Sequence, residues 1–262
     1  MKRIVLFCII LMGAAMSQMA ESNEITLNIV YNNVAFDRAL TLSWGMACVI
    51  EGTDKVILFD TGGDGHTLLS NMKAMGIDPG QIDIVVLSHI HGDHTGGLES
   101  FLAANSDITL YVPRSFPKDF KNRMEAKAAR VVEVAAPIEI CNQVYSTGEL
   151  GSWIKEQALV VKTGGGLVMV TGCAHPGVVH MAKRALELFD SDIHLITGGF
   201  HLGGSSENEI KKIINELREF GVKKVGPSHC TGEKAIEKFR EAWGKEFVDA
   251  GCGAVIKIPN ER

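Results

Sequence analysis

The sequence has no excess of positive charge and no apolar run long enough to cross a membrane. Its 262 residues carry a formal net charge of -5 at pH 7. A mildly acidic chain lacks the basic surface that attracts nucleic acids and anionic lipids, so neither is favoured as a partner. The longest unbroken apolar run, Ile4–Met12, is too short for a stable membrane span. Low-complexity stretches and obvious linkers are also absent, which favours one sizeable core.

The N-terminus has the features of a signal peptide. Lys2 and Arg3 precede the apolar run Ile4–Met12, and small residues follow it, with plausible cleavage after Ser17 or Ala20. This order of basic, apolar and small residues is typical of an exported protein. We therefore assign residues 1–20 to a signal peptide and residues 21–262 to a single domain. The mature protein is expected to be exported, either to a periplasm or out of the cell.

The cysteines are few, and their number is odd once the signal peptide is removed. Six cysteines fall to five without Cys8. In an oxidising compartment an odd number leaves at least one thiol unpaired or bound to a metal. Cys48, Cys141 and Cys252 are expected to be buried small hydrophobic residues. The other two, Cys173 and Cys230, lie in motifs that contain histidine.

Short apolar runs alternate with helical patterns along the chain, which predicts layered sheets covered by helices. The expected helices are Thr67–Met75, Phe116–Ala129, Val178–Phe189 and Glu207–Phe220, the last with a capping box from Ser206 and Glu209. The expected strands are Ile25–Tyr31, Trp44–Glu51, Lys55–Phe59, Ile82–Leu87, Asp107–Val112, Arg130–Val134, Ala158–Val161, Leu167–Val170, Asp192–Thr197, Val222–Val225 and Ala254–Ile258.

Four of these strands run directly into polar segments that contain histidine. The segments are Ser88–His94, Thr171–His175, Gly198–His201 and Pro227–Cys230. If the strands share one edge of a sheet, these segments converge on a single site.

The segment from His89 to His94 has the composition of a metal-binding loop. It holds three histidines and Asp93 within six residues. His89 and His91 would face one side of an extended chain, and Asp93 with His94 would follow a turn at Gly92. Imidazole and carboxylate groups suit zinc, iron or manganese. The pattern predicts one or two divalent metal ions, with zinc as the first choice.

The motif Ser88-His89-Ile90-His91-Gly92-Asp93-His94 resembles the H-x-H-x-D-H signature of the metallo-β-lactamase superfamily. Leu58-Phe59-Asp60-Thr61-Gly62, Thr171-Gly172-Cys173 and Pro227-Ser228-His229 resemble three further motifs of that superfamily. The resemblance implies an α/β fold of the αββα sandwich type with the metals at one edge. It also implies that Asp60 supports the metal loop, that Cys173 stands where many members have a bridging aspartate, and that His229 is a ligand.

The resemblance breaks at one position. The superfamily pattern implies another histidine ligand between His94 and Cys173, but the sequence has none there. His175 can take its place, and Glu149 is the alternative; we favour His175. As ligands the sequence thus offers His89, His91, Asp93, His94, Cys173, His175 and His229.

Two residues next to these motifs have less certain roles. By resemblance, His201 could contact substrate, where it would donate a proton to a leaving group or steady developing charge. The alternative is a loop histidine with a backbone partner. Cys173 is either a metal-bound thiolate or a thiol that lines the site. Cys230 would point away from the site if the chain were extended, so a structural role is favoured for it.

Hydrolysis of an ester, a phosphoester or a similar electrophile in a small-molecule substrate is the leading hypothesis. Metal ions would supply hydroxide at neutral pH, Asp93 would be a ligand that also orients the nucleophile, and His201 would serve the leaving group. The narrower motifs around His175, His201 and Cys230 are similar to a subgroup often labelled dihydropterin-ribofuranosylaminobenzene phosphate synthase, so a transferase is one alternative. A non-catalytic metal-binding or ligand-binding module is the other. The sequence does not indicate an oligomeric state.

Overall fold

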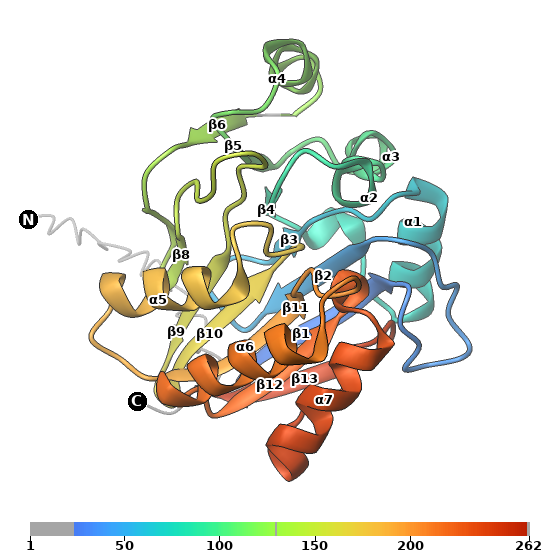
Figure 1. Ribbon diagram of the computed structural model, residues 1–262. Coiled ribbons are helices and arrows are strands. Elements are labelled where there is room, and N and C mark those ends of the chain that lie inside the picture. The colour runs from blue at the N-terminus through green and yellow to red at the C-terminus, as the bar shows by residue number, and fades with distance from the viewer. Residues whose placement is uncertain (1–23, 129, 261–262) are drawn as a thin grey trace, which may run out of the picture.

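The computed structural model describes residues 24–128 and 130–260. The predicted signal peptide, residues 1–20, lies outside these residues. No helix in the described part of the chain has the length and apolar character that crossing a membrane requires. The described residues form two sheets with helices packed against both (Figure 1).

The first sheet has seven strands and is mixed. Its N-terminal strands pair antiparallel, whereas the strands from β3 to β6 run parallel to one another. In spatial order its strands are β13 (Val255–Pro259), β1 (Glu24–Asn32), β2 (Met46–Glu51), β3 (Ile57–Phe59), β4 (Ile84–Val86), β5 (Thr109–Pro113) and β6 (Arg130–Val134).

The second sheet has six strands. Its last three strands are parallel, and the others pair antiparallel. In spatial order they are β12 (Lys224–Ser228), β11 (Ile193–Gly199), β10 (Gly166–Thr171), β9 (Leu159–Thr163), β8 (Val144–Ser146) and β7 (Ile138–Cys141).

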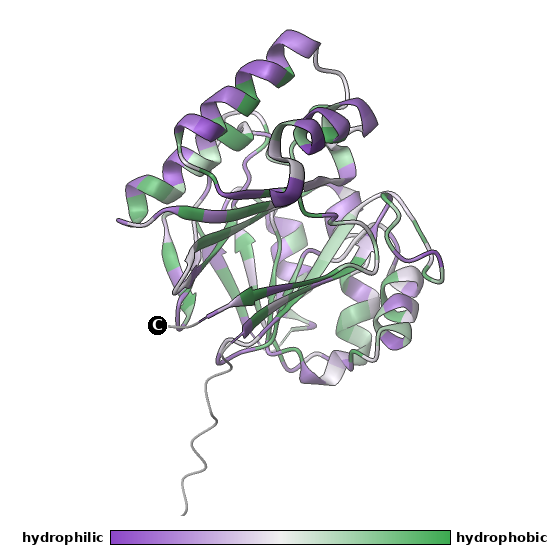
Figure 2. Ribbon diagram, turned by 90° about the horizontal axis from the view of Figure 1, so that it is seen from below, coloured by the Kyte–Doolittle hydropathy of each residue, from purple (hydrophilic) through white to green (hydrophobic). Residues whose placement is uncertain are grey.

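Three apolar cores define four layers, which confirms the predicted αββα sandwich. The middle core contains buried residues from the inner faces of both sheets, such as Ile29 and Val168. One outer core joins the first sheet to α1 (Gly65–Ala74), α3 (Leu98–Ala104) and α4 (Lys118–Glu125). The other joins the second sheet to α5 (Val178–Leu188), α6 (Glu207–Glu219) and α7 (Glu233–Trp243). Figure 2 shows these helices with hydrophilic residues on their outer faces.

The predicted strands and helices are all present, with ends that differ by a few residues. The capping box at the start of α6 is confirmed, because Ser206 accepts from Glu209 N while the Glu209 carboxylate accepts from Ser206 N. The strands β7 and β8 and the helices α2 (Gly92–Thr95), α3 and α7 were not predicted. β7 and β8 are only four and three residues long, so they carry little periodic signal.

The four strand ends that carry histidine converge, although they do not share one sheet: β4 lies in the first sheet, and β10, β11 and β12 lie in the second. Strands β10, β11 and β12 are parallel neighbours, and Thr171 pairs with Gly198 while Gly199 pairs with Ser228. Their carboxyl ends therefore lie at one edge of the second sheet. Gln157 links the second sheet to the first at this edge. Its backbone N–H donates to the Ser88 carbonyl and its side chain donates to the Leu87 carbonyl, just after β4.

Candidate metal centre

The loop after β4 places four predicted ligands by changing conformation in the middle. His89 is fully buried in the extended part, and the short helix α2 (Gly92–Thr95) begins immediately after His91. Asp93 and His94 lie in this helical turn, so they project differently from His89 and His91. The turn arises from the start of a helix, and Gly92 does not adopt a positive φ.

Three histidines form the first group of potential ligands, which we call the histidine group. Nitrogen atoms of His89, His91 and His175 all lie within 4.8 Å of one another. His89 Nε2 is 3.1 Å from His91 Nδ1, and the ring of His175 lies edge-on to both at 4.8 Å between centroids. The structure therefore places His175 where the missing histidine would be required.

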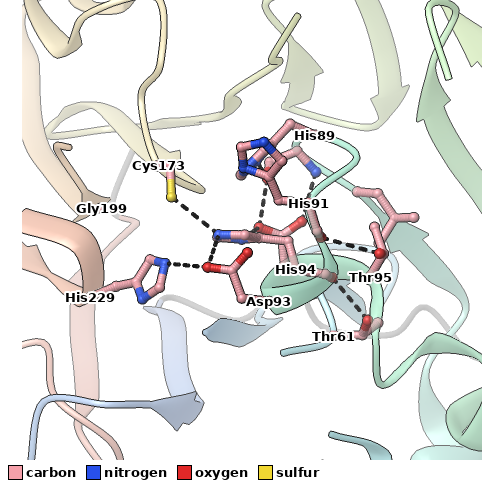
Figure 3. A network of polar contacts seen from close by, with 12 residues as sticks. Thr61, His89, His91, Asp93, His94, Thr95, Cys173, Gly199 and His229 are labelled. Atoms are coloured by element: carbon pink, nitrogen blue, oxygen red, sulfur yellow. Dashed lines mark hydrogen bonds and ion pairs between the residues drawn. The ribbon is translucent and has the colours of Figure 1, made fainter. Parts of the chain in front are cut away.

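Four residues form a second group, which we call the mixed group: Asp93, His94, Cys173 and His229. Their ligand atoms also lie within 4.8 Å of one another. Cys173 Sγ lies 3.2 Å and an Asp93 oxygen 3.6 Å from His94 Nε2. Figure 3 marks both contacts with dashed lines. The same oxygen lies 3.2 Å from His229 Nε2. The rings of His89 and His94 are 4.3 Å apart, so the two groups are neighbours.

Asp60 links the two groups through its contacts with Ser88 and His94. Its carboxylate accepts hydrogen bonds from Ser88 N and Ser88 Oγ and contacts His94 Nδ1, each at 2.7 Å. Ser88 Oγ in turn lies 2.9 Å from His89 Nδ1. A partner on the second ring nitrogen orients a histidine so that the first nitrogen faces a metal. The supporting role implied for Asp60 agrees with this geometry.

Glu156 holds the loop that carries Cys173 and His175, and the sequence analysis missed it. Its fully buried carboxylate accepts from the backbone N–H groups of Cys173, Ala174 and His175 at 2.8–2.9 Å. Burial raises the pKa of Glu156 to about 7, although these N–H groups oppose the shift. No sequence motif marks this glutamate, because its partners follow it by 17 to 19 positions.

Glu149, the alternative to His175, lies elsewhere. Its carboxylate accepts from Ser115 N at 2.6 Å in an exposed contact, and it belongs to neither group. Asn33 is a further residue that the sequence analysis missed. Its side-chain oxygen lies 2.7 Å from His229 Nδ1, which orients that ring toward Asp93.

The prediction that Cys230 points away from the site is wrong. Its sulfur, the sulfur of Cys173 and a ring nitrogen of His201 lie within 4.8 Å of one another, so Cys230 points toward the site. The prediction assumed an extended chain, but His229 has a φ of 51° and begins a 3₁₀ turn. Neighbouring side chains in a turn do not alternate as they do in a strand.

His201 lies at the rim of the histidine group. Its exposed ring is 4.3 Å from the ring of His175. A hydrogen bond with Cys230 raises the pKa of His201, which increases its protonated fraction near neutral pH. His201 thus lies at the exposed edge of the histidine group, in contact with His175.

The protonation of His89, His175 and Asp93 suits cation binding. Burial and the neighbouring histidines lower the pKa of His89, and they lower that of His175 to about 4, so both are neutral at pH 7. Burial alone would raise the pKa of Asp93, but His229 and His94 hold it well below its ordinary value. The hydrogen bond with Cys230 and burial raise the pKa of Cys173. A cation bound at the sulfur would oppose that shift.

The sequence match and the fold identify the family. Residues 45–182 match the model of the metallo-beta-lactamase superfamily, and this segment covers just over half of the chain. The chain belongs to this superfamily.

Three known proteins match more than four-fifths of the chain. A 7,8-dihydropterin-6-methyl-4-(beta-D-ribofuranosyl)-aminobenzene-5'-phosphate synthase of Methanocaldococcus jannaschii is 30% identical, over 82% of this chain and 90% of its own. A solved metal-dependent hydrolase of the beta-lactamase superfamily is 26% identical and superposes with a TM-score of 0.76, covering 90% of this chain and 99% of its own. A diphosphatase of the PhnP family, 12% identical with a TM-score of 0.60, over 90% of this chain and 97% of its own, shares the fold.

Proposed function

We propose that this protein is a metal-dependent hydrolase of a small-molecule ester, phosphoester or similar electrophile. The observation that carries the proposal is the pairing of the histidine group with the mixed group at one edge of the sheets. Divalent ions held by these groups would polarise the electrophile and lower the pKa of bound water toward ~7. The chain itself would hold the ions, orient the substrate and supply protons.

The donor atoms fit such ions. Among the described residues, His175 Nε2 and His229 Nε2 are buried without a hydrogen-bond partner of normal geometry, and His229 Nε2 lies 3.2 Å from the Asp93 carboxylate. Buried polar atoms without partners are costly unless something else satisfies them. Imidazole, thiolate and carboxylate together favour zinc, with iron or manganese as alternatives.

Two residues would have distinct tasks in the reaction. Asp93 would hold the mixed group together, because its carboxylate faces both His94 and His229. The same carboxylate would orient the attacking nucleophile. His201 would donate a proton to the leaving group, because it lies at the exposed rim next to His175 and its pKa is raised.

A transferase is the second candidate, and the similarity to the Methanocaldococcus jannaschii synthase favours it. A transferase would use the same groups but pass the electrophile to an acceptor other than water. Product analysis separates the two reactions, since ¹⁸O from labelled water appears in the product only after hydrolysis.

The first test measures metal per chain by elemental mass spectrometry, followed by a screen of esters and phosphoesters in ¹⁸O-labelled water. We expect about two ions per chain, one for each group of ligands, and a product that contains ¹⁸O. Labelled water that never enters the product, while an acceptor does, would favour the transferase. A chain that binds no metal even after reconstitution would instead be a non-catalytic module.

A further inference from the structure

The loop between β8 and β9 is fixed to the metal centre. Leu150 and Glu156 pair as an isolated bridge, with reciprocal backbone hydrogen bonds of 2.9 and 3.1 Å. Glu156 also accepts three backbone hydrogen bonds from the loop of Cys173 and His175. The tip between Leu150 and Glu156 therefore has a defined position relative to the histidine group.

Trp153 lies at this tip with its side chain in solvent. It is 93% exposed, the highest value among the exposed large apolar side chains of the described residues. The backbone around it is closely packed, because a Cβ atom on Gly151 would lie 2.8 Å from Ile154 O and 3.2 Å from the Pro176 ring. Large aromatic side chains normally bury most of their area, so a fixed loop that exposes one is suited to contact with a ligand.

A hollow joins Trp153 to the histidine group. It has a volume of about 460 Å³. Its wall is formed by Gly151, Ser152, Trp153, Ile154, His175, Pro176 and His180. This volume lies within the range of small-ligand sites. The lining thus combines an indole and an aliphatic side chain with His175, a proposed metal ligand. A ligand in this hollow would thus have an apolar part at Trp153 and a polar part at the metals.

Two large exposed apolar side chains, Trp44 and Trp153, lie beside the centre. Of the five large ones in the described residues, only Val255 lies outside two loops. One loop carries Trp153, and the other carries Phe36, Leu42 and Trp44. Trp44 is 5.0 Å from the ring of His229. Exposed aromatic side chains beside a group of polar ligands are typical of a substrate site.

We propose that Trp153 forms a subsite for a planar aromatic or heteroaromatic group of the substrate. The group would stack on the indole, with Ile154 and His180 at its edges, and the reacting bond would lie beside His175. The indole face favours flat rings over saturated ones because stacking adds to the burial of apolar area. This subsite rests on the proposed function for the identity of the reacting end.

Phenylphosphonate and cyclohexylphosphonate test the subsite without turnover. Both compounds carry a phosphonate group that can bind metal ions. Neither contains an ester bond that the proposed hydrolysis would cleave. Isothermal titration of the zinc-loaded protein measures each dissociation constant. Because stacking adds to burial, we expect phenylphosphonate to bind about fivefold more tightly than the cyclohexyl compound. Trp153→Ala should abolish this preference, and Trp153→Phe should retain most of it.

Lys155→Ala is the matched control, because Lys155 lies in the same loop but does not line the hollow. It should keep the preference, and all variants should keep the wild-type zinc content. An unchanged preference in Trp153→Ala with full zinc content would overturn the subsite. Failure of the proposed function is a separate result: esters and phosphoesters would not turn over, while the dependence of the preference on Trp153 persisted.

Discussion

The histidine group and the mixed group differ in charge and in how the fold holds them. The histidine group has only imidazoles, and the pKa values of two of them, His89 and His175, are lowered. The mixed group adds a carboxylate and a thiol, so it can bring negative charge to a cation. The comparison indicates that an ion in the mixed group is held more tightly. Loss of one ligand should therefore have different consequences in the two groups.

The largest expected effect comes from the mixed group. Asp93→Ala removes the carboxylate that faces His94 and His229, so we expect one ion per chain and turnover lower by roughly a thousandfold. Elemental mass spectrometry and kcat measure the two effects. His194→Ala, at the far end of β11 from the centre, is the control and should keep both. Full turnover by metal-stripped Asp93→Ala would refute the mechanism.

A smaller effect is expected at Asp60, because it orients His94 directly and His89 through Ser88 and is not itself a proposed metal ligand. Asp60→Asn weakens the contacts to His94 Nδ1 and Ser88 Oγ, and Ser88 Oγ contacts His89. We expect metal affinity to fall by about 10–100-fold. Competition with a chelator, which follows the loss of each ion, measures this. A loss confined to the mixed group would show that Ser88 does not transmit the effect to His89.

Glu156 sharpens the comparison, because it holds His175 and Cys173 through their backbones. Glu156→Gln replaces one acceptor oxygen by an amide donor, so the free energy of unfolding should fall by about 1–3 kcal/mol. Denaturant titration of the metal-free protein measures this.

The pH dependence of that stability has a defined sign. Burial raises the pKa of Glu156 from 4.5 to about 7, so the folded protein binds a proton that the unfolded chain releases. This contribution to stability is present below pH ~4.5 and is lost as pH rises through ~7. Glu156→Gln should abolish that part of the slope, and an unchanged slope would assign it to another group.

The smallest effect is expected at Glu149. Glu149→Ala should leave the metal content unchanged and cost about 1 kcal/mol or less, because its hydrogen bond from Ser115 N lies at an exposed position. His175→Ala should release the ion of the histidine group under the same conditions. Loss of metal from Glu149→Ala, but not from His175→Ala, would reverse the assignment.

Part of the fold was predictable because its signal is local. Alternation and buried runs located the core strands, and Ser206 with Glu209 marked the start of α6. The helix α7 was missed even though its apolar residues Ala235, Phe239 and Trp243 have helical spacing. Its N-cap is Gly232 at a φ of 81°, which has no side chain to mark the beginning of a helix.

The sequence by itself identified the candidate metal ligands, because His89, His91, Asp93 and His94 lie within six residues and two other strand ends carry Cys173, His175 and His229. Only the tertiary structure decided how these groups divide, that His175 completes the histidine group, and that Cys230 faces Cys173. It alone placed Glu156 and Trp153 beside the centre. The reason is physical: these relations depend on distances between segments far apart in the chain, and local patterns do not encode them.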